Sequence, residues 1–309
     1  MNISDDHFRY ISDNQRAAAL FKASVQTIEI EIHSYCNRTC DFCGNSLFDR
    51  HSRKTPMDLA VYSKIVDDLA SIGYCGVIWY SRYNEPTSDR PLFIQRLIEA
   101  RAKLPNARLQ TFSNGDYLTA EYIEALRDAG LNDLKIMAYL PKGEKPTEAN
   151  FLVLMESRLM KLGLPWELVA SNRAEVDVPG IHVTYAFSDF SRTGTNRGGA
   201  LATGKIINRK APCTIPITDI YVDYNGSMVP CCDIRSDYEA HRDCVVYVLN
   251  GQNSIFDGYA NSKLVLWRRD ATRFGRKGFP CNSCSRGSWG PASLTWWRCC
   301  SRWFFSRQK

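Results

Sequence analysis

The chain has 309 residues, 44% of them hydrophobic and 23% charged, and a formal net charge of +6. This composition is that of a globular protein, and the length suits one large α/β unit with a smaller appendage. No apolar run reaches the roughly eighteen residues of a membrane span, and the polar, acidic N-terminus does not resemble a secretory signal. We therefore expect a cytoplasmic protein with no membrane partner.

Strand and helix patterns alternate along the first two-thirds of the chain. The predicted strands, recognised by alternating or short continuous hydrophobic runs, cover 27–33, 76–81, 107–113, 133–139, 164–171 and 180–187. The predicted helices cover 57–72, 91–103, 119–130 and 147–162. Repeated strand–helix units imply a parallel sheet with right-handed crossovers, either open or closed into a full or partial barrel.

The pattern changes around residue 190, where the chain becomes rich in Gly, Ser, Thr and Arg before short strands and cysteines follow. We expect four segments: an N-terminal helical extension, a main α/β unit, a cysteine-rich domain and a basic aromatic tail, over 1–26, 27–195, 196–295 and 296–309. A basic tail with aromatic residues can contact nucleic acid. A solvated surface or a terminal helix docked on the cysteine-rich domain is more common, so we expect no nucleic-acid partner.

The first predicted strand has two different faces. One carries Ile28, Ile30 and Ile32, and the other carries Glu29, Glu31 and His33. A parallel strand that is buried on both faces is normally hydrophobic throughout. We therefore expect the polar face to line a wet cavity in which these three polar residues contact a substrate. The alternative is an edge strand with one solvated face.

A first group of cysteines follows this strand directly. Cys36, Cys40 and Cys43 form the pattern C-x3-C-x2-C, and metal binding is a commoner role than disulfide formation in a reducing compartment. Three thiolates at this spacing can hold three corners of a 4Fe–4S cluster and leave one iron open. A zinc ion is the alternative, with His33 or His51 as its fourth ligand.

The segment YCNRTCDFC resembles the signature of the radical S-adenosylmethionine (SAM) superfamily. The resemblance implies a 4Fe–4S cluster whose open iron binds SAM, and an external one-electron reductant of the flavodoxin or ferredoxin type. Reductive cleavage of SAM then gives a 5′-deoxyadenosyl radical. The implied fold is α/β, a partial (β/α)6 TIM-like barrel, and Phe42 is implied to lie against the adenine.

Other SAM-binding positions are implied by the same resemblance. The turn RYNEP lacks the two glycines usual in the family but retains Glu85, which is implied to bind the amino group of SAM. The turn FSNG implies that Ser113 and Asn114 contact the ribose. Arg192 lies where related enzymes place a residue for the SAM carboxylate.

A second group of cysteines lies in the C-terminal third. YVDYNGSMV reads as a hairpin that turns at Asn225-Gly226, which can bring Cys231 back beside Cys213. Cys281 and Cys284 form C-x2-C and can supply two more ligands. This arrangement resembles the small auxiliary Fe–S domain of SPASM and twitch radical SAM enzymes, in its shorter, single-cluster form. It implies a second 4Fe–4S cluster, and a structural zinc is the alternative.

Two reactions fit an auxiliary cluster. In both, the radical abstracts a hydrogen atom from an unactivated carbon of a small-molecule substrate. A dehydrogenase then passes one electron to the auxiliary cluster and one proton to a base. An epimerase instead returns a hydrogen atom from a thiol on the opposite face. Cys244 is the expected donor and Cys232 the alternative, because four-ligand coordination requires neither.

One auxiliary cluster with an extra thiol resembles the radical SAM epimerases of aminoglycoside biosynthesis, of the neomycin epimerase kind. We therefore expect an epimerase that acts on an amino sugar, with Glu29 and Glu31 pairing with its ammonium groups. A twitch-type dehydrogenase that oxidises an aminocyclitol or sugar alcohol is the second choice, and a peptide-modifying enzyme the third. A metal-binding scaffold without catalysis is the remaining alternative, against which the intact cysteine signature and Glu85 argue.

Overall fold

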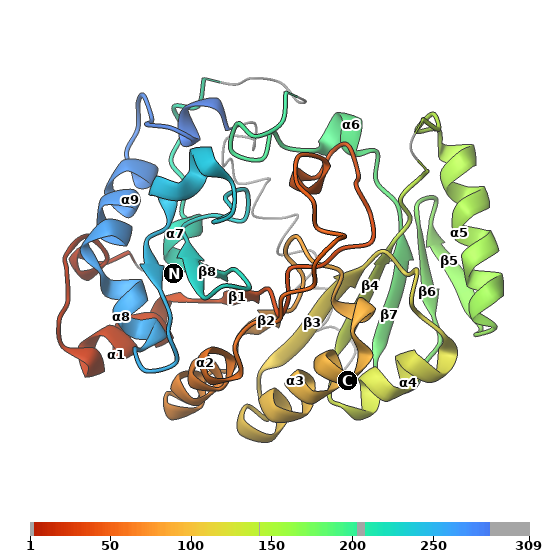
Figure 1. Ribbon diagram of the computed structural model, residues 1–309, viewed down its shortest axis with the longest axis horizontal. Helices are drawn as coiled ribbons and strands as arrows, with labels where there is room; N and C mark the ends of the chain where they lie inside the picture. The colour runs from red at the N-terminus through yellow and green to blue at the C-terminus, as the bar shows by residue number, and fades with distance from the viewer. Residues whose placement is uncertain (1–2, 142, 203–207, 285–309) are drawn as a thin grey trace.

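The computed structural model describes residues 3–141, 143–202 and 208–284 (Figure 1). Within them, ten strands form one sheet in the order β10-β9-β8-β1-β2-β3-β4-β7-β6-β5. The strands are β1 (Thr27–Ile30), β2 (Val77–Trp79), β3 (Arg108–Ser113), β4 (Asp133–Met137), β5 (Trp166–Ala170), β6 (Arg173–Val176), β7 (His182–Ala186), β8 (Asp219–Val222), β9 (Ser227–Val229) and β10 (Tyr247–Val248). The run from β8 through β1, β2, β3 and β4 to β7 is parallel, and the strands on either side of it pair antiparallel.

Helices α2, α3 and α4 lie along the outer side of the curved sheet, with α5 beyond its β5 end (Figure 1). The helices are α1 (Asn14–Ser24), α2 (Leu59–Ser71), α3 (Arg90–Lys103), α4 (Ala120–Asp128), α5 (Glu148–Leu162), α6 (Phe190–Thr193), α7 (Ile215–Thr218), α8 (Ile255–Ala260) and α9 (Ser262–Thr272). None of the helices in the described ranges has the length and apolar character needed to cross a bilayer.

Local signals account for where these helices begin. Asp58, Asp89, Thr119 and Thr147 each stand immediately before a helix and accept a hydrogen bond from a backbone N–H of its first turn. Such caps satisfy amides that have no partner inside the helix. The helices predicted between the strands are thereby confirmed, with ends that differ by a few residues at most.

The hydrophobic core lies between the sheet and these helices. Ile28 and Ile30 of β1, Ile78 of β2, Leu109 of β3 and Leu134 of β4 are all fully buried. Alternate residues of each strand point to the opposite, concave side of the sheet. The core therefore determines which side chains of each strand face the concave side. Because the strands are parallel, the loops at their carboxyl ends meet at one edge of the sheet.

The strand predicted at 164–171 takes a different place from the one expected. β5 pairs antiparallel with β6, which the sequence patterns did not predict, and β6 pairs antiparallel with β7. The two strands form a hairpin at the sheet edge, so β7 follows β4 directly in the parallel order. The turn between them is only two residues long, which leaves no room for a helical crossover.

The sheet continues across the change in sequence pattern near residue 190. β8 lies in the cysteine-rich segment, yet it pairs in parallel with β1, with Ile28 opposite Ile220. The predicted hairpin follows it, since β8 and β9 pair antiparallel around Asn225-Gly226. Gly226 has φ of +80°, and a Cβ there would lie 2.4 Å from the carbonyl oxygen of Leu249. Only glycine suits this turn.

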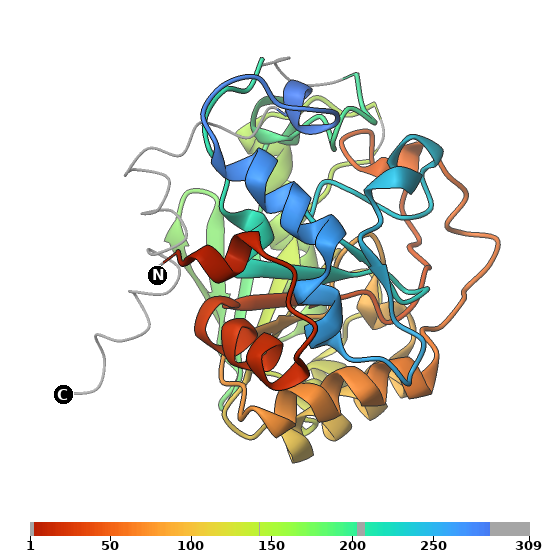
Figure 2. The same ribbon diagram turned by 90° about the vertical axis from the view of Figure 1, so that its left-hand side faces the viewer.

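The N-terminal helix packs on the C-terminal part of the chain. Helices α1, α8 and α9 lie side by side in Figure 2, and contacts join α1 to α8 and α8 to α9. Phe21 of α1 is fully buried, with its ring edge-on to Phe256 and Tyr259 at centroid distances of 5.2 Å each. Helices α1 and α8 thus share one aromatic cluster.

We expect Phe21→Ala to lower the free energy of unfolding by about 3–5 kcal/mol, because it empties a buried site between two aromatic rings. Urea unfolding followed by circular dichroism measures this loss. Phe274→Ala is the matched control, since Phe274 is 82% exposed, and it should change the value by less than about 0.5 kcal/mol. Equal effects of the two substitutions would contradict the assigned packing of α1.

Candidate functional site

The first cysteine group lies on the loop that follows β1, at the carboxyl edge of the parallel strands. The amide of Cys43 donates to the carbonyl of Cys40 at 2.9 Å, and the amide of Cys36 donates to the carbonyl of Arg50 at 3.3 Å. Burial raises the pKa of the Cys36 and Cys40 thiols to about 12, and their nearness to the Cys43 thiol adds to the effect. Thiols in such surroundings become thiolates only when a cation binds them.

The spacing of these thiols fits a cluster better than a single zinc ion. Ligand atoms around tetrahedral zinc, with Zn–S bonds of about 2.3 Å, lie less than about 4 Å apart. Among the described residues, the ligand atoms of Cys231, Cys232 and Asp233 all lie within 4.8 Å of one another. The three cysteines of the first group do not form such a set. The three thiols of the first group are therefore more widely spaced and suit an iron–sulfur cluster.

The cysteine loop is held by Asp116, which follows β3. Arg38, between the first two cysteines, donates from Nε and Nη2 to the two carboxylate oxygens at 2.6 Å each, and Asn37 donates to one of them at 2.8 Å. Arg158 of α5 adds an ion pair at 2.7 Å. Although burial opposes ionisation, the hydrogen bonds and charges of Arg38 and Arg158 lower the pKa of Asp116 to about 2.

The predicted SAM-binding residues at the next two strand ends lie together. Oε1 of Glu85 accepts hydrogen bonds from the hydroxyls of Thr87, at 2.6 Å, and Ser113, at 2.9 Å. Oε2 accepts a hydrogen bond from the backbone N–H of Asn114 at 2.7 Å. Burial raises the pKa of Glu85. The Asn114 side chain donates to Asn37 at 2.8 Å. The structure therefore brings Glu85, Ser113 and Asn114 together beside the cysteine loop.

Phe42 contacts the helix that carries Arg192, but Arg192 itself is exposed. The Phe42 ring stacks on Phe190 of α6 with a centroid distance of 4.4 Å and an interplanar angle of 18°, and Tyr139 lies 5.3 Å away. The structure thus provides an aromatic surface at Phe42 and does not bring the Arg192 side chain to it.

A different arginine, Arg197, reaches the loop. Its Nε donates to the carbonyl of Phe42 at 3.4 Å, and its Nη1 lies 3.5 Å from Asp233. Burial opposes the charge of the guanidinium, but Tyr83 and Asp233 raise its pKa. Cys43 and Cys232 are also within electrostatic range and add to the effect. Arg197 adopts φ of +48°, a conformation that costs roughly 1 kcal/mol or more and that often marks a functional position.

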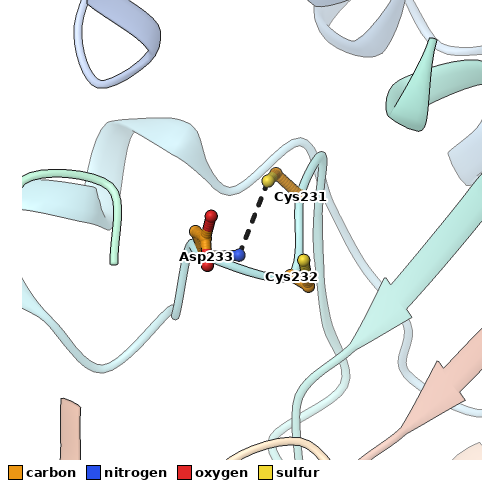
Figure 3. Close-up of side chains that lie close together, drawn as sticks. All are labelled: Cys231, Cys232 and Asp233. Carbon is orange, nitrogen blue, oxygen red and sulfur yellow. Dashed lines mark hydrogen bonds between the residues drawn. The ribbon is translucent and has the colours of Figure 1, made fainter. Parts of the chain in front are cut away.

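The second cysteine group gathers from three separate segments. The four predicted ligands line one cavity together with Arg209 and Lys277, and they are Cys213, Cys231, Cys281 and Cys284. Burial raises the pKa of Cys281 to about 12. The amide of Asp233 donates to Sγ of Cys231 at 3.5 Å on the turn after β9 (Figure 3). The donor set and the burial fit an iron–sulfur cluster.

The two candidate hydrogen donors have different surroundings. Cys244 is 4% exposed and lies in an apolar cluster with Ile215, Tyr221, Val229 and Ile234, where burial raises its pKa to about 11. Such a thiol has the environment of a small hydrophobic residue. Cys232 lies on the turn in Figure 3, and its carbonyl accepts from the hydroxyl of Tyr83 at 3.0 Å.

A buried arginine joins the two cysteine groups. Arg235 donates from Nη1 to Asn45 at 3.2 Å, and its guanidinium lies 4.5 Å from the ring centroid of Tyr83. Asn45 in turn donates to the carbonyl of Tyr83 at 2.7 Å. Asp237 accepts two hydrogen bonds from Arg235, at 2.6 and 2.9 Å. Residues shortly after Cys43 and shortly after Cys232 are thereby fixed to one another.

Two of the three polar residues of the strand predicted at 27–33 are fully buried, and β1 itself ends at Ile30 before them. Glu31 is fully buried and accepts from Arg50 at 3.1 Å and from two backbone amides. His33 is also fully buried, and burial lowers its pKa to about 4. Glu29 retains 19% exposure of its side chain and lies 3.6 Å from Arg82. The prediction that all three contact a substrate is therefore wrong for Glu31 and His33, because groups far away in the sequence enclose their side chains. Glu29 alone keeps an exposed side chain.

Comparisons with known proteins agree with this geometry. Residues 30–138 match the radical SAM superfamily. Over 266 residues, which are 84% of this chain and 93% of the relative, the chain is 26% identical to the S-adenosyl-L-methionine-dependent 2-deoxy-scyllo-inosamine dehydrogenase of Niallia circulans.

Among solved structures, the chain is similar to BtrN in complex with AdoMet and 2-DOIA, with a TM-score of 0.62, 23% identity and coverage of 85% of this chain and 93% of that chain. It is also similar to BtrN in an open conformation, with a TM-score of 0.57, 21% identity and coverage of 85% and 92%. The chain therefore carries a radical SAM domain and has the partial TIM-like barrel fold expected for it. SAM and a 4Fe–4S cluster are the cofactors of such domains.

Sequence reasoning missed several residues of the site. Asp116 and Arg197 were not singled out, although Asp116 lies two residues after Asn114 in the turn FSNGD and could have been found there. Arg209 and Arg235 stand in no recognisable motif. Their roles depend on contacts between segments far apart in the chain.

We expect Asp116→Asn to lower the free energy of unfolding of the cluster-free protein by about 1–2 kcal/mol at pH 7, because the pKa of Asp116 in the fold, about 2, is below its ordinary value of 3.8. A lowered pKa stabilises the fold above about pH 4, and this contribution disappears as the pH falls towards 2. Urea unfolding at pH 7, 5 and 3 measures the difference between the two proteins.

Asp128→Asn is the control for this measurement, since Asp128 is a 67% exposed partner of Arg127. It should have little effect at any of the three pH values. A difference between wild type and Asp116→Asn that is as large at pH 3 as at pH 7 would contradict the assigned ion pairs.

Proposed function

We propose that the protein is a radical SAM dehydrogenase that oxidises a secondary alcohol of an aminocyclitol to a ketone. The observation that carries this proposal is the gathering of Cys213, Cys231, Cys281 and Cys284 around one cavity, which would hold a second 4Fe–4S cluster able to accept an electron. The 26% identical relative, an enzyme named for the oxidation of 2-deoxy-scyllo-inosamine, supports the same reaction.

The epimerase expected first from the sequence has weaker support. Its hydrogen donor, Cys244, is enclosed by apolar side chains, against which Cys213 and Cys231 pack. Cys232 remains the alternative donor, since it lies within electrostatic range of Arg197. The relative named above is a dehydrogenase. We therefore place the dehydrogenase first and keep epimerisation as an outcome that the experiment can detect.

We assign the cofactor positions residue by residue. Cys36, Cys40 and Cys43 would hold the first cluster, and Glu85 would bind SAM through its carboxylate, with Ser113, Asn114 and the Phe42–Phe190 stack completing the site. Bound there, SAM supplies the radical that removes a hydrogen atom from the substrate carbon, with an external one-electron reductant of the flavodoxin or ferredoxin type. The Glu85 hydrogen bonds keep its oxygens in fixed positions for an ammonium group.

The substrate would lie between the two cysteine groups. Arg197 lies within electrostatic range of Cys43 in the first group and of Cys232, the residue after Cys231 of the second group, so it is suited to orient the alcohol oxygen. We propose that Glu29, with its exposed fraction and its negative charge, pairs with the ammonium group of an aminocyclitol. The oxidation removes one hydrogen atom from carbon, one proton from oxygen and one electron, which together leave a carbonyl.

We expect the anaerobically reconstituted enzyme, given SAM, a reductant and 2-deoxy-scyllo-inosamine, to form a product about two mass units lighter and about one 5′-deoxyadenosine for each product. Mass spectrometry of the product formed in deuterated water measures this change in mass. A product one unit heavier would mean that a thiol returned hydrogen, and the enzyme would then be an epimerase.

We expect Cys281→Ala/Cys284→Ala to reduce bound iron from about eight to about four atoms per chain, because it removes two ligands of the second cluster. SAM cleavage should continue, while the yield of ketone per 5′-deoxyadenosine falls at least tenfold, because the substrate radical loses its electron acceptor. Iron analysis and chromatography measure both. Cys75→Ala, at an exposed cysteine, is the control. Full ketone yield in the double variant would show that this group of cysteines is not the electron acceptor.

A further inference from the structure

Arg209 lies beside the second cysteine group and has no part in the assignments above. It is 4% exposed and lines the same cavity as the four cysteines. Its Nη1 donates to Sγ of Cys284 at 3.5 Å. Nε and Nη2 donate to the carbonyls of Ala211 and Pro212 at 3.2 and 3.0 Å. The two carbonyls immobilise the guanidinium plane and hold one N–H against the sulfur.

The backbone of Arg209 is also fixed to the cysteine segment. Its amide donates to the carbonyl of Asn282, which lies between Cys281 and Cys284, at 3.2 Å. Arg209 and the C-x2-C pair are thus joined through both main chain and side chain. The position of the guanidinium relative to the cysteines is a property of the fold rather than of a flexible surface residue.

A second buried cation lines this cavity. Lys277 is 4% exposed and its ammonium donates to the carbonyls of Asp270, Ala271 and Arg273. Its contacts are with main-chain oxygens of the α9 end, whereas Arg209 contacts a cysteine sulfur directly. Of the two cations, Arg209 is therefore the one that acts on the ligands themselves.

Hydrogen bonds to the sulfur ligands and nearby positive charge stabilise the reduced, more negative form of an iron–sulfur cluster and so raise its reduction potential. The effect is stronger for a buried group, because solvent screens its charge less. Arg209 meets both conditions, because it donates a hydrogen bond to the sulfur of Cys284 and carries a buried positive charge. A higher potential makes the cluster a better acceptor for an electron that leaves the substrate.

We propose that Arg209 is a positioning residue that raises the reduction potential of the second cluster and thereby favours loss of an electron from the substrate over return of a hydrogen atom. This inference rests on the proposed function. The substrate carbon first gives a hydrogen atom to the 5′-deoxyadenosyl radical. The remaining radical then loses the hydroxyl proton to solvent and one electron to the second cluster, which is reduced as the C=O bond forms.

The test is a redox titration of the holoenzyme followed by electron paramagnetic resonance, with the first cluster identified by its response to added SAM. We expect Arg209→Gln to lower the midpoint potential of the second cluster and to leave that of the first unchanged. Arg209→Lys, which keeps the charge without the planar donor, should give an intermediate shift and serves if the glutamine variant loses iron. The ketone yield per 5′-deoxyadenosine should fall severalfold, with unchanged SAM cleavage.

Arg268→Gln is the matched control. Arg268 is fully buried, donates to the carbonyls of Pro216 and Tyr259 and stacks on the Tyr259 ring at 3.9 Å. Its loss should destabilise the protein without changing either potential. An unchanged potential of the second cluster in both Arg209 variants, or a second site that binds zinc, would overturn the inference.

The test separates the two proposals. If the wild-type enzyme forms ketone and the Arg209 variants keep the wild-type potential, the proposed function stands and the role of Arg209 fails. If the variants shift the potential and the wild type epimerises its substrate, the role of Arg209 in setting the potential stands and the dehydrogenase fails.

Discussion

The guanidinium of Arg235 is packed between two halves of the candidate site, and their relative position depends on it. Asn45 and Tyr83 belong to the loops that carry the first cysteines and Glu85, and both contact this group. Gly44 leaves the space, since a Cβ there would lie 2.8 Å from Nη1. A buried charge requires a paired carboxylate, and Asp237 supplies it. In the proposed reaction the substrate would give up a hydrogen atom at one site and an electron at the other, and a rigid connection would hold both sites around it.

The buried network of ion pairs continues beyond Arg235 and Asp237. Asp237 also pairs with Arg50, which pairs with Glu31 directly after β1. Each member satisfies the charge of its neighbour, so a buried network of this kind is stable only when it is complete. Because Glu31 belongs to this network, its carboxylate is not available to bind a substrate. The sheet face that looks polar in the sequence therefore partly serves to anchor the segment around Asp237 to the residues after β1.

Features that depend on neighbouring residues could be predicted from the sequence, and features that depend on distant partners could not. Hydrophobic periodicity located the parallel strands and their helices, and cysteine spacing located both thiol groups. The β5–β6 hairpin was missed because a short apolar run looks alike in a crossover strand and in a hairpin. Asp116, Arg197 and Arg209 act through contacts with residues far along the chain, and no local pattern records such contacts.

The parallel pairing of β8 with β1 means that the two parts of the protein are not separable modules. β1 has β2 on one side and β8 on the other, so a chain that ended near residue 195 would expose the edge of a central strand. Such edges pair with other chains and aggregate. During synthesis, the barrel portion emerges from the ribosome before the strand that completes its sheet. The protein therefore has to keep β1 from pairing with other chains until the last third of the polypeptide arrives.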